Sequence, residues 1–561
     1  MKWWYPEKWA VTLEELVKRV LTALEKEPSL TAENFIQCNP SLFKTPNRLK
    51  SHIYLVDSLI KNKGLPKPER FPDRADMILK VFEMGHSMNR CYQHKGELYV
   101  RFATENGNAI MCKPEQEPFK RYLVKAHNGL FKKTMETSTY RRVVLNIRRL
   151  PYTDVKLTNR VAEKDGRFFY DLSDGTGRVV QITAGKGWSI GIPKEPLFLL
   201  GDTALPAFEP IQVSDPITSF NKLWLYLPQD VKYSLLHMVE FVFAFIPTGP
   251  QPIPSISGET GSAKTTYVKT IKRFIDPGIS DAVELPENTT KLAHILSTSR
   301  LIMFDNVSYI NRSQSDMLCQ ASTGGHAPSR KLYTDTDTID RDLGAVVTLN
   351  GLTITVTEPD LMRRVLLFLF PLIPPEKKMT LQKLNNAIDS IGPEVLGAVF
   401  DIVSKAMALV PKYEDLKEKS TMADFEMWAC AITEALGRDP NEFLKLYREN
   451  QQLQKGEVLA ADILGTVLVK FVQLSMALEK SQTFKIDKLT LLARLTTDAE
   501  VINRNLTRGK YWPSSIKGLA KRLDKLRATL REIGLEFTES REKVHGVQEQ
   551  VITFTAKNVF V

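Results

Sequence analysis

Cysteine is scarce in this sequence, and the cysteines are never paired. Five of them are scattered over 561 residues, and no two form a C-x-x-C motif. Structural zinc sites and disulfide frameworks depend on closely spaced cysteines, so the sequence argues against both. We expect a protein of a reducing cytoplasm.

Long apolar segments are also lacking. The most apolar run, residues 233–245, contains His237 and Glu240 and stops before Pro247, so it is too short and too polar to span a bilayer. The first residues, Met-Lys-Trp-Trp-Tyr-Pro, do not have the pattern of a signal peptide. We therefore expect a cytoplasmic location and no membrane partner.

Signatures of several other function classes are missing. The chain has no internal repeat, no low-complexity tract and no N-K-x-D guanine motif. Residues 75–205 lack the two or three clustered carboxylates that a two-metal primase or polymerase site needs. Asp171 and Asp174 flank a glycine-rich turn, and we expect them to shape that turn.

Charge of both signs is present but unbalanced. Lys and Arg number 76 against 65 Asp and Glu, which gives a net charge of +11. A basic excess of this size suits a polyanionic partner, but it also suits an ordinary soluble protein, so only its clustering is informative. The length predicts three or four domains, each with its own core.

Periodicity and turn residues give a coarse map of the elements. The pattern of apolar residues predicts helices at residues 13–24, 51–61, 119–132, 138–150, 381–387, 393–408, 424–435 and 441–450. It predicts strands at residues 98–102, 109–113, 166–172 and 178–182. Residues 206–375 alternate helix and strand, as a parallel α/β sheet requires.

The clearest motif is a glycine-containing loop between a strand and a helix. Residues 253–266 read Ile-Pro-Ser-Ile-Ser-Gly-Glu-Thr-Gly-Ser-Ala-Lys-Thr-Thr, which matches the P-loop pattern G-x-x-x-x-G-K-[ST] except at Ala263. The alternative is a chance Gly/Ser turn, which the flanking strand and helix disfavour. Backbone N–H groups of such a loop cradle phosphates at a helix N-terminus. The predicted nucleotide-binding residues are Gly258, Glu259, Thr260, Gly261, Ser262, Ala263, Lys264, Thr265 and Thr266.

A second acidic motif should complete an ATP and Mg²⁺ site. We expect Lys264 to reach the β- and γ-phosphates and Thr265 to bind Mg²⁺. Residues 301–304 are apolar and predict a buried strand, and Asp305 at its end is expected to hold the same Mg²⁺, unless it is an ordinary strand-end Asp. Many ATPases carry Glu next, but Asn306 stands here; an amide positions water without acting as a base, so the base stays open.

Two further residues are candidates for catalysis. Asn350 ends a third apolar strand, where a contact with the γ-phosphate or the attacking water is expected; the alternative is a turn Asn before a glycine. Arg364 lies between a proline-marked loop and an apolar strand. In a ring of subunits it would reach a neighbour's γ-phosphate as an arginine finger; otherwise it is solvent-facing or paired with a carboxylate.

A hairpin is predicted between the second and third strands. A helix ends at residues 324–325, and the hairpin that follows carries Arg330 and Lys331, which suit DNA phosphates. The expected tip also carries aspartates that repel DNA, at positions 335, 337, 340 and 342. The assignment of this hairpin to DNA binding is therefore left open.

The C-terminal residues combine a helix with a basic hairpin. Apolar residues repeat at a spacing of three and four: Ile516, Leu519, Leu523, Leu526, Leu530 and Ile533. A hairpin follows, and its turn is expected to include basic residues. Helix and basic wing together predict a winged helix, and the DNA-binding candidates are Lys517, Lys521, Lys525, Arg541 and Lys543. The alternative is an ordinary solvated face.

With these motifs in order, residues 160–560 resemble a known group. The sequence is similar to AAA+ helicase and replication-initiator ATPases of mobile genetic elements, of the staphylococcal pathogenicity-island initiator and cassette-helicase type, which are related to minichromosome-maintenance and superfamily 3 helicases. The resemblance rests on residues 166–172, 258–265, 304–308, 315–319, 323–325, 330–335, 349–351, 359–364 and 422–425.

The resemblance implies a hexameric ring that threads DNA, with ATP sites between subunits and Arg364 acting in trans. Alanine before the P-loop lysine also occurs in minichromosome-maintenance proteins. Two positions depart from the family pattern: Arg363 stands where an acidic residue is expected, and Thr421 where an arginine is expected.

The expected fold is α/β, with an AAA+ P-loop core, a helical lid, an α+β N-terminal region and a C-terminal winged helix. The expected segments are a helical domain at 1–70, an α+β accessory domain at 71–205, the ATPase core at 206–375, the lid and connector at 376–490 and the winged helix at 491–561.

Two functions follow from this sequence. The first is an ATP-dependent DNA helicase or replication initiator that forms a homo-oligomeric ring, hexameric by the resemblance. The second is a DNA-binding AAA+ switch or scaffold that assembles on DNA without unwinding it. A P-loop kinase or GTPase leaves the basic C-terminal segment unexplained.

Overall fold

The computed structural model divides the chain into two compact units. Unit 1 holds residues 1–183, 188–209 and 276–279, and unit 2 holds the rest. The structure describes residues 19–20, 22–23, 26–27, 29, 31–39, 74–85, 89–104, 107–131, 133–199, 203–228, 230–279, 282–330, 338–351, 356, 358–416, 421–502, 512–544 and 547–556.

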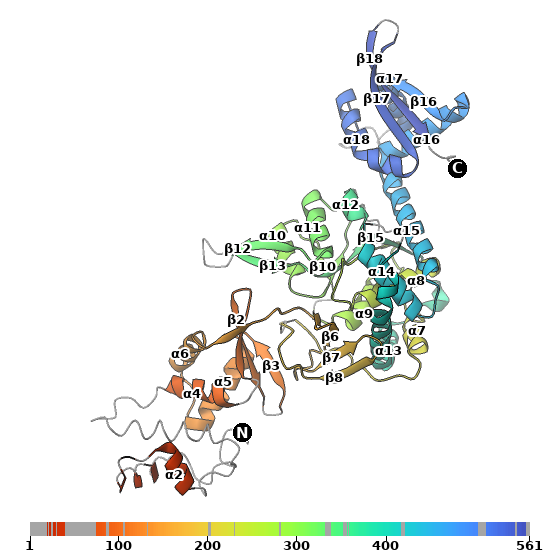
Figure 1. Ribbon diagram of the computed structural model, residues 1–561. Coiled ribbons are helices and arrows are strands. Elements are labelled where there is room, and N and C mark those ends of the chain that lie inside the picture. Colours follow the sequence, from red (N-terminus) through yellow and green to blue (C-terminus); the bar gives the residue numbers. More distant parts are fainter. Residues whose placement is uncertain are drawn as a thin grey trace. The chain divides into compact units, whose positions relative to one another are not determined.

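The first part of unit 1 packs three helices on a small sheet (Figure 1). Strands β1 (Arg90–His94), β2 (Glu97–Ala103), β3 (Ala109–Cys112) and β4 (Tyr152–Asp154) are arranged in the order β3-β2-β1-β4. Their apolar core includes residues of α4 (Arg74–Gly85), α5 (Glu117–Phe131) and α6 (Thr137–Ile147). The strands and helices expected between residues 98 and 150 are therefore confirmed.

The expected helical domain at residues 1–70 falls mostly outside the described residues. Within it the structure gives the short helix α2 (Ala32–Cys38), whose first turn is capped by the Thr31 side chain. The expected helices at residues 13–24 and 51–61 lie largely or wholly outside the described part.

A second sheet of unit 1 contains the glycine-rich turn. Strands β5 (Val161–Lys164), β6 (Arg167–Asp171), β7 (Val179–Thr183) and β8 (Gly187–Gly191) follow one another in space as they do in sequence. The strands expected at residues 166–172 and 178–182 correspond to β6 and β7.

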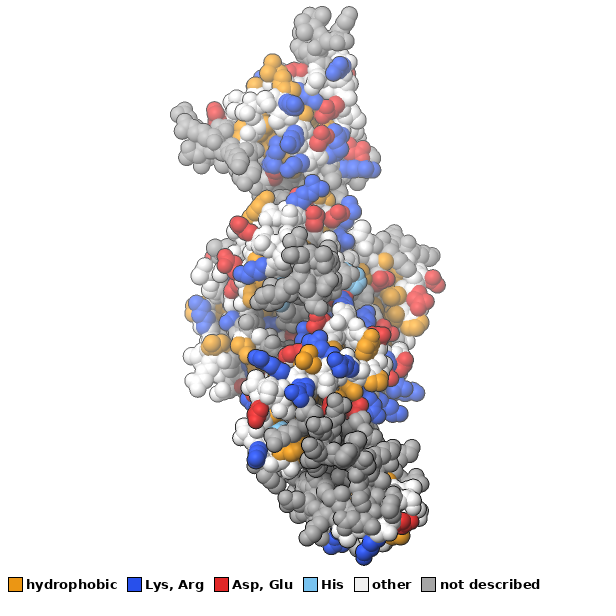
Figure 2. Space-filling view, turned by 90° about the vertical axis from the view of Figure 1, so that its left-hand side faces the viewer, with side chains coloured by type: hydrophobic (Ala, Val, Ile, Leu, Met, Phe, Trp, Pro, Cys, Tyr) orange, Lys and Arg blue, Asp and Glu red, His pale blue; other side chains and the backbone are white. Residues whose placement is uncertain are grey.

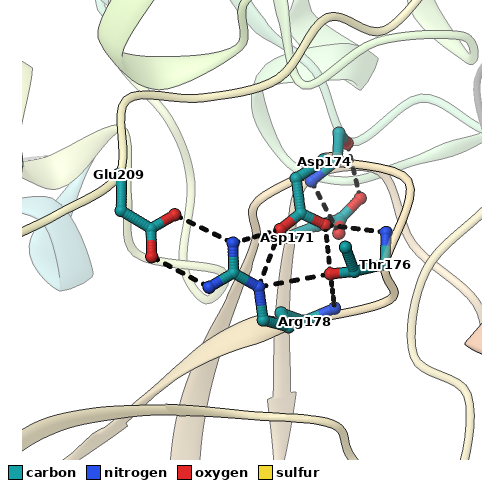
Figure 3. A network of polar contacts seen from close by, with 6 residues as sticks. Asp171, Asp174, Thr176, Arg178 and Glu209 are labelled. Atoms are coloured by element: carbon teal, nitrogen blue, oxygen red, sulfur yellow. Dashed lines mark hydrogen bonds and ion pairs between the residues drawn. The ribbon is translucent and has the colours of Figure 1, made fainter. Parts of the chain in front are cut away.

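The polar side chains of this turn bind one another, as Figure 3 shows. Asp171 accepts hydrogen bonds from the backbone and hydroxyl of Ser173 at 3.1 and 2.6 Å. Asp174 accepts from the backbone of Thr176 at 2.8 Å and from the Arg178 guanidinium. Arg178 also forms two bonds with Glu209, at 2.9 and 3.0 Å. The expectation that Asp171 and Asp174 shape the turn is confirmed.

Unit 2 is built on a five-stranded parallel sheet (Figure 1). The strands are β9 (Ile253–Gly258), β10 (Val283–Glu284), β11 (Leu301–Asp305), β14 (Val346–Gly351) and β15 (Val365–Phe370). Their order is β10-β11-β14-β9-β15, and each neighbouring pair is parallel. The longer strands are buried along nearly their whole length, as parallel strands covered on both faces must be. The expected mixed α/β fold with a parallel sheet is confirmed.

Helices connect and cover these strands. Helix α9 (Lys264–Ile275) follows β9 and lies against β9, β11 and β14. Helices α10 (Thr289–Leu296) and α11 (Arg312–Ser322) join side chains of β11 and β14 in one apolar core. The short helix α12 (Pro359–Met362) precedes β15.

The helical region after the sheet differs from the prediction at one point. We expected two helices, at residues 381–387 and 393–408, but helix α13 runs unbroken as Leu381–Leu409 with Pro393 inside it. Proline removes one helical N–H and usually ends or kinks a helix. Here buried side chains continue on both sides of it, including Ile388 and Val395, so packing sustains the helix. The expected helices at 424–435 and 441–450 correspond to α14 (Ala423–Ala435) and α15 (Pro440–Ala461).

The C-terminal elements share one apolar core. They are α16 (Ile463–Glu479), β16 (Thr483–Asp487), α17 (Lys488–Ile502), α18 (Ile516–Glu532), β17 (Leu535–Val544) and β18 (Val547–Ala556). The sheet order is β16-β18-β17, with Phe554 paired to Phe484 on one side and to Phe537 on the other.

This core corrects two expectations. It draws buried side chains from Leu464 to Phe554, so the packed assembly begins near residue 463 instead of at residue 491. Arg541 and Lys543 lie within strand β17, paired with Gln550 and Gln548, instead of in the turn. The periodic helix expected from residue 516 is confirmed as α18.

All five cysteines carry free thiols. Within the described residues, no helix is both long enough and apolar enough to cross a bilayer.

A buried polar group lies between helices α8 and α9. After its first residue, helix α8 (Ser234–Phe243) is apolar except for His237 and Glu240, and both of these are buried. His237 Nδ1 lies 2.9 Å from the Tyr267 hydroxyl of α9, and its ring stacks on Phe368 with centroids 3.6 Å apart. Burial lowers the pKa of His237 to about 3 and raises the pKa of Glu240 to about 8, so both side chains are mainly neutral at pH 7.

Glu240 should give the fold a pH dependence that a neutral isostere removes. Its pKa rises from 4.5 to about 8 on folding, so between these values the folded state binds more protons and stability falls as the pH rises. We therefore expect the free energy of unfolding of the Glu240→Gln variant to rise relative to that of the wild type by on the order of 1 kcal/mol per pH unit across this window. Urea unfolding of both proteins at several pH values measures this; parallel pH profiles would contradict it.

Candidate functional site

The predicted site residues meet at the carboxyl edge of the parallel sheet. Strand β14 lies between β9, which leads into the glycine loop, and β11, which ends at Asp305. Phe304 pairs with Leu349, and Asn350 pairs with Ile256. The polar ends of the three strands therefore lie side by side, because parallel strands bring their carboxyl ends to one edge.

The Asn350 amide joins the two sequence-predicted metal ligands. Its Nδ2 donates to Asp305 Oδ1 at 2.6 Å and to Thr265 Oγ1 at 3.1 Å. Asn350 is only 2% exposed, and its Oδ1 is buried with no hydrogen-bond partner among the described residues. The residues Thr265, Asp305 and Asn350, 85 positions apart at most, thus form one connected polar group.

The glycine loop is held by backbone contacts. A Cβ on Gly258 would lie 2.5 Å from the carbonyl oxygen of Phe370, so this position excludes any side chain. Lys264 Nζ donates to the carbonyls of Gly258 and Glu259 at 2.6 and 3.0 Å. Ser262 Oγ donates to the Glu259 carbonyl at 2.9 Å, which closes the loop before α9 begins at Lys264.

Two residues beside the site have left-handed backbones. Ala263 and Asn306 both have φ of 55°. Alanine pays a steric cost there, whereas asparagine is among the non-glycine residues that adopt this conformation most readily. The Asn306 backbone N–H donates to Asp305 Oδ1 at 2.9 Å, while its side chain is exposed. The tight turn after β11 therefore gives a physical reason for Asn where many ATPases carry Glu.

The oxygen atoms of this site fit a magnesium ion. Asp305 Oδ1 and Thr265 Oγ1 converge on one amide group and are hard ligands of the kind that Mg²⁺ prefers. Among the described residues, no three His, Cys, Asp or Glu side chains gather as a metal site. One carboxylate suits Mg²⁺ bound through waters and substrate phosphates, and it does not suit an ion held by a protein cage.

Arg364 lies at the opposite edge of the sheet. Val365 pairs with Ile253 at the start of β15, and Phe370 pairs with Gly258 at its end. Six residue steps along the strand, about 20 Å, separate Arg364 from Phe370 at the level of the loop, more than an arginine side chain spans. Its Nη1 donates to the Asp360 carbonyl at 2.6 Å. The structure therefore does not bring Arg364 to the loop of its own chain.

The predicted hairpin is present as β12 (His326–Arg330) and β13 (Thr338–Asp342), which project from the sheet in Figure 1. At its base, His326 Nδ1 lies 2.7 Å from Asp342 Oδ1. Lys331 lies outside the described residues, and for Arg330 only the backbone is described. Their role in DNA binding stays a prediction.

Helix α18 separates its basic residues into two sets. Arg522 pairs with Asp462 at 2.5 Å, Arg527 with Asp524 at 2.8 Å, and Arg531 with Glu536 at 3.3 Å. The other set is exposed and forms no ion pair within the described part of the chain: Lys517, Lys521 and Lys525.

The unpaired lysines share one face of α18. Their spacing of four residues brings them into line along the helix. Figure 2, viewed from the side on which Figure 1 places α18, shows Lys and Arg side chains interspersed with acidic ones on the C-terminal elements. The three lysines, together with the exposed Arg541 of β17, are therefore positive charges in this region that an outside partner could contact.

One determinant of the loop was missed by sequence reasoning. Phe370 ends strand β15, and its carbonyl oxygen limits Gly258 to glycine. No local signal could identify this contact, because it depends on which strand pairs with β9.

Two substitutions in the loop should have opposite effects on stability. Gly258→Ala places a Cβ against the Phe370 carbonyl and should destabilise the fold by about 1–3 kcal/mol. Ala263→Gly removes a left-handed alanine and should be neutral or stabilising by up to about 1 kcal/mol. Urea unfolding measures both. The reverse order of stabilities, or equal losses, would show that the loop has a different conformation.

Comparisons with known proteins agree with part of the expected resemblance. Residues 229–449 match the family model described as "Actinomycete integrative conjugative element replication protein", and residues 464–559 match "AICE RepA C-terminal domain". The second match begins where the C-terminal apolar core begins, at Leu464. No curated protein matches the chain.

Solved structures give only weak similarity. The apo C-terminal region of NrS-1 is 12% identical and has a TM-score of 0.40, over 85% of this chain and 98% of that one. JCV helicase is 13% identical and has a TM-score of 0.22, over 40% of this chain and 65% of that one. Scores this low do not establish a shared fold.

The family matches support the broad expectation of a replication protein of a mobile element. The narrower assignment to the AAA+ initiators of staphylococcal islands and cassettes stays a prediction. Over residues 229–449 and 464–559, this chain is similar to the replication proteins of actinomycete integrative conjugative elements.

Proposed function

We propose that this chain is an ATP-dependent DNA helicase or replication initiator of a mobile genetic element, with an AAA+ ATPase core. The observation that carries the proposal is the Asn350 amide, which links Asp305 and Thr265 beside the glycine loop. Three polar residues from separate parts of the sequence meet where a phosphate loop needs its metal ligands. A chance Gly/Ser turn gives no reason for this convergence.

Each residue of the site has a defined task in this proposal. The loop N–H groups and Lys264 hold the phosphates, and Thr265 and Asp305 hold Mg²⁺. The bound nucleotide supplies a terminal phosphoanhydride for hydrolysis. Asn350 orients Asp305 through its Nδ2, and its buried Oδ1 has no hydrogen-bond partner among the described residues. Asn306 is exposed and positions water without removing its proton.

The position of Arg364 supports action between subunits. It lies at the amino edge of the sheet, out of reach of its own loop, so it contributes to hydrolysis only by meeting the site of another copy. A homo-oligomeric ring, hexameric by the resemblance, provides that arrangement. The packed helices α13, α14 and α15 after the sheet support the assignment of a helical lid.

The C-terminal elements support a winged helix that binds DNA. Their order of helix, strand, two helices and a two-stranded hairpin is the one that a winged helix requires, with α18 as the helix presented to DNA. Lys517, Lys521 and Lys525 contact phosphates in this proposal, and Arg541 does so from the wing. Arg330 and Lys331 of the projecting hairpin are proposed to grip DNA as well.

One observation favours a second function. With Asn306 after Asp305, the site lacks the adjacent carboxylate that removes a proton from water in many ATPases. A slow ATPase that assembles on DNA as a switch or scaffold, without separating strands, needs no fast base.

Strand separation distinguishes the two functions. We expect the purified chain with ATP and Mg²⁺ to unwind a forked duplex and Lys264→Ala to lose this activity. Asn350→Ala should lower ATP hydrolysis by about 10–100-fold, because the residue orients a metal ligand. The Arg364→Ala variant should hydrolyse ATP more slowly than the wild type while still binding a nucleotide analogue. Unwinding by Lys264→Ala would refute the helicase, whereas DNA-stimulated hydrolysis without unwinding would support the switch.

Lys517, Lys521 and Lys525 form a lysine stripe along α18, and its removal should weaken DNA binding regardless of the DNA sequence. In the triple variant Lys517→Ala, Lys521→Ala and Lys525→Ala, the slope of log affinity against log salt should fall by about one for each lysine. Arg531→Ala is the matched control, since it removes one charge from the same helix but this arginine is paired with Glu536. Fluorescence anisotropy over a salt series measures the slopes. An equal slope change per residue in the control would contradict a phosphate-binding stripe.

A further inference from the structure

Helix α15 connects the parallel sheet to the C-terminal elements as one continuous helix (Figure 1). Its first part packs by one buried face, with the side chains of Phe443, Tyr447, Asn450 and Gln454 at a spacing of four, three and four. Phe443 and Tyr447 contact Phe425 of α14, with ring centroids 5.9 and 5.7 Å away. The helix is therefore fixed where it passes the sheet.

Asn450 binds the outer edge of that sheet. Strand β15 is the last strand, and its partner β9 covers only one of its sides. Leu367 N–H donates to Asn450 Oδ1 at 3.0 Å, and Asn450 Nδ2 donates to the Leu367 carbonyl at 2.6 Å. The side-chain amide thus replaces a neighbouring strand, and it is fully buried.

These two bonds fix the register of α15 on β15. If the helix slipped by one turn, the amide and both backbone groups would be buried without hydrogen-bond partners, which destabilises each of them. The flanking aromatic side chains would tolerate such a slip far better, because apolar contacts have little directionality. Asn450 is therefore the residue that ties α15 to one position on the edge strand.

The far end of α15 is tied to helix α18 through one carboxylate. Asp462 directly follows α15; its Oδ1 accepts from the Gly465 N–H at 3.0 Å and caps α16. Its Oδ2 accepts from Arg522 Nη2 at 2.5 Å. Arg522 lies on α18 between Lys521 and Lys525, so this ion pair orients the lysine stripe.

The two contacts are joined by one continuous helix. From Asn450 to the end of α15 the helix rises about 17 Å. At the sheet, Leu367 pairs with Ser255, three residues before Gly258 of the glycine loop. One helix thus reaches from the strand pair that shapes the loop to the carboxylate that holds the lysine helix.

We propose that α15 couples the nucleotide site to the DNA-binding face, with Asn450, Asp462 and Arg522 as positioning residues. This rests on the proposed function, since it assumes that ATP binds at the loop and DNA at α18. A change in the loop that shifts β15 would move Asn450 and, with it, helix α15 and Asp462. Because Asp462 pairs with Arg522, this movement would also shift the lysine stripe. Because coupling is reciprocal, DNA must change the affinity for nucleotide by the same factor as nucleotide changes the affinity for DNA.

The test measures both affinities, each with and without the other ligand. The probes are a fluorescent non-hydrolysable ATP analogue with Mg²⁺ and a labelled DNA duplex. For the wild type we expect equal coupling factors in both directions, in the range of about 5–150-fold typical of linked sites. In the Asp462→Asn variant the coupling factor should fall towards one, while the affinities for the nucleotide alone and for DNA alone should stay unchanged. The reason is that asparagine still caps α16 but cannot form the ion pair with Arg522. Arg522→Gln should behave in the same way.

Two further variants make the result decisive. Arg531→Gln removes an ion pair from the same helix without a link to α15, so it should keep the wild-type factor. Asn450→Leu should lose coupling, and if it does not fold, the Asp462→Asn result stands alone. A wild-type factor of one, or full coupling in both Asp462→Asn and Arg522→Gln, would overturn the inference. Failure of the wild type to bind either probe would instead overturn the proposed function.

Discussion

The site depends on the way strand β9 is enclosed. It is hydrogen-bonded to β14 on one side and to β15 on the other, so the loop that follows it is constrained by both neighbouring strands. On the β15 side the Phe370 carbonyl allows no side chain at Gly258. On the β14 side Asn350 reaches both Thr265 and Asp305. The loop conformation and the placement of the predicted metal ligands thus depend on strand pairing more than on the loop sequence alone.

Much of this arrangement could be predicted from the sequence, and the exceptions share a cause. The glycine loop, Asp305, Asn350 and the α18 stripe are local patterns of a few residues with known chemistry. Strand β16 could not be predicted from its local sequence, because it pairs with β18, about 70 residues away in the chain. The sequence predicts two helices in place of α13, because the local propensity of Pro393 is unfavourable and says nothing of the buried side chains on both sides of it. The Phe370 and Asn450 contacts depend entirely on tertiary pairing.

Charge illustrates the same limit. A net charge of +11 does not say which cations are available to a partner. On α18 the arginines at 522, 527 and 531 are held by carboxylates, whereas the three stripe lysines are exposed without ion pairs among the described residues. Ion pairing within the fold therefore decides which part of a basic surface can meet a polyanion, and spacing along the helix decides its direction.

The Asn450 amide also has a consequence for self-association. An edge strand with open N–H and carbonyl groups is a template on which another molecule can add a strand. At Leu367, in the middle of β15, both outward groups are already bonded to Asn450. Copies of this chain cannot extend the sheet across that point. Any contact between copies at this point of the edge must therefore be made by side chains.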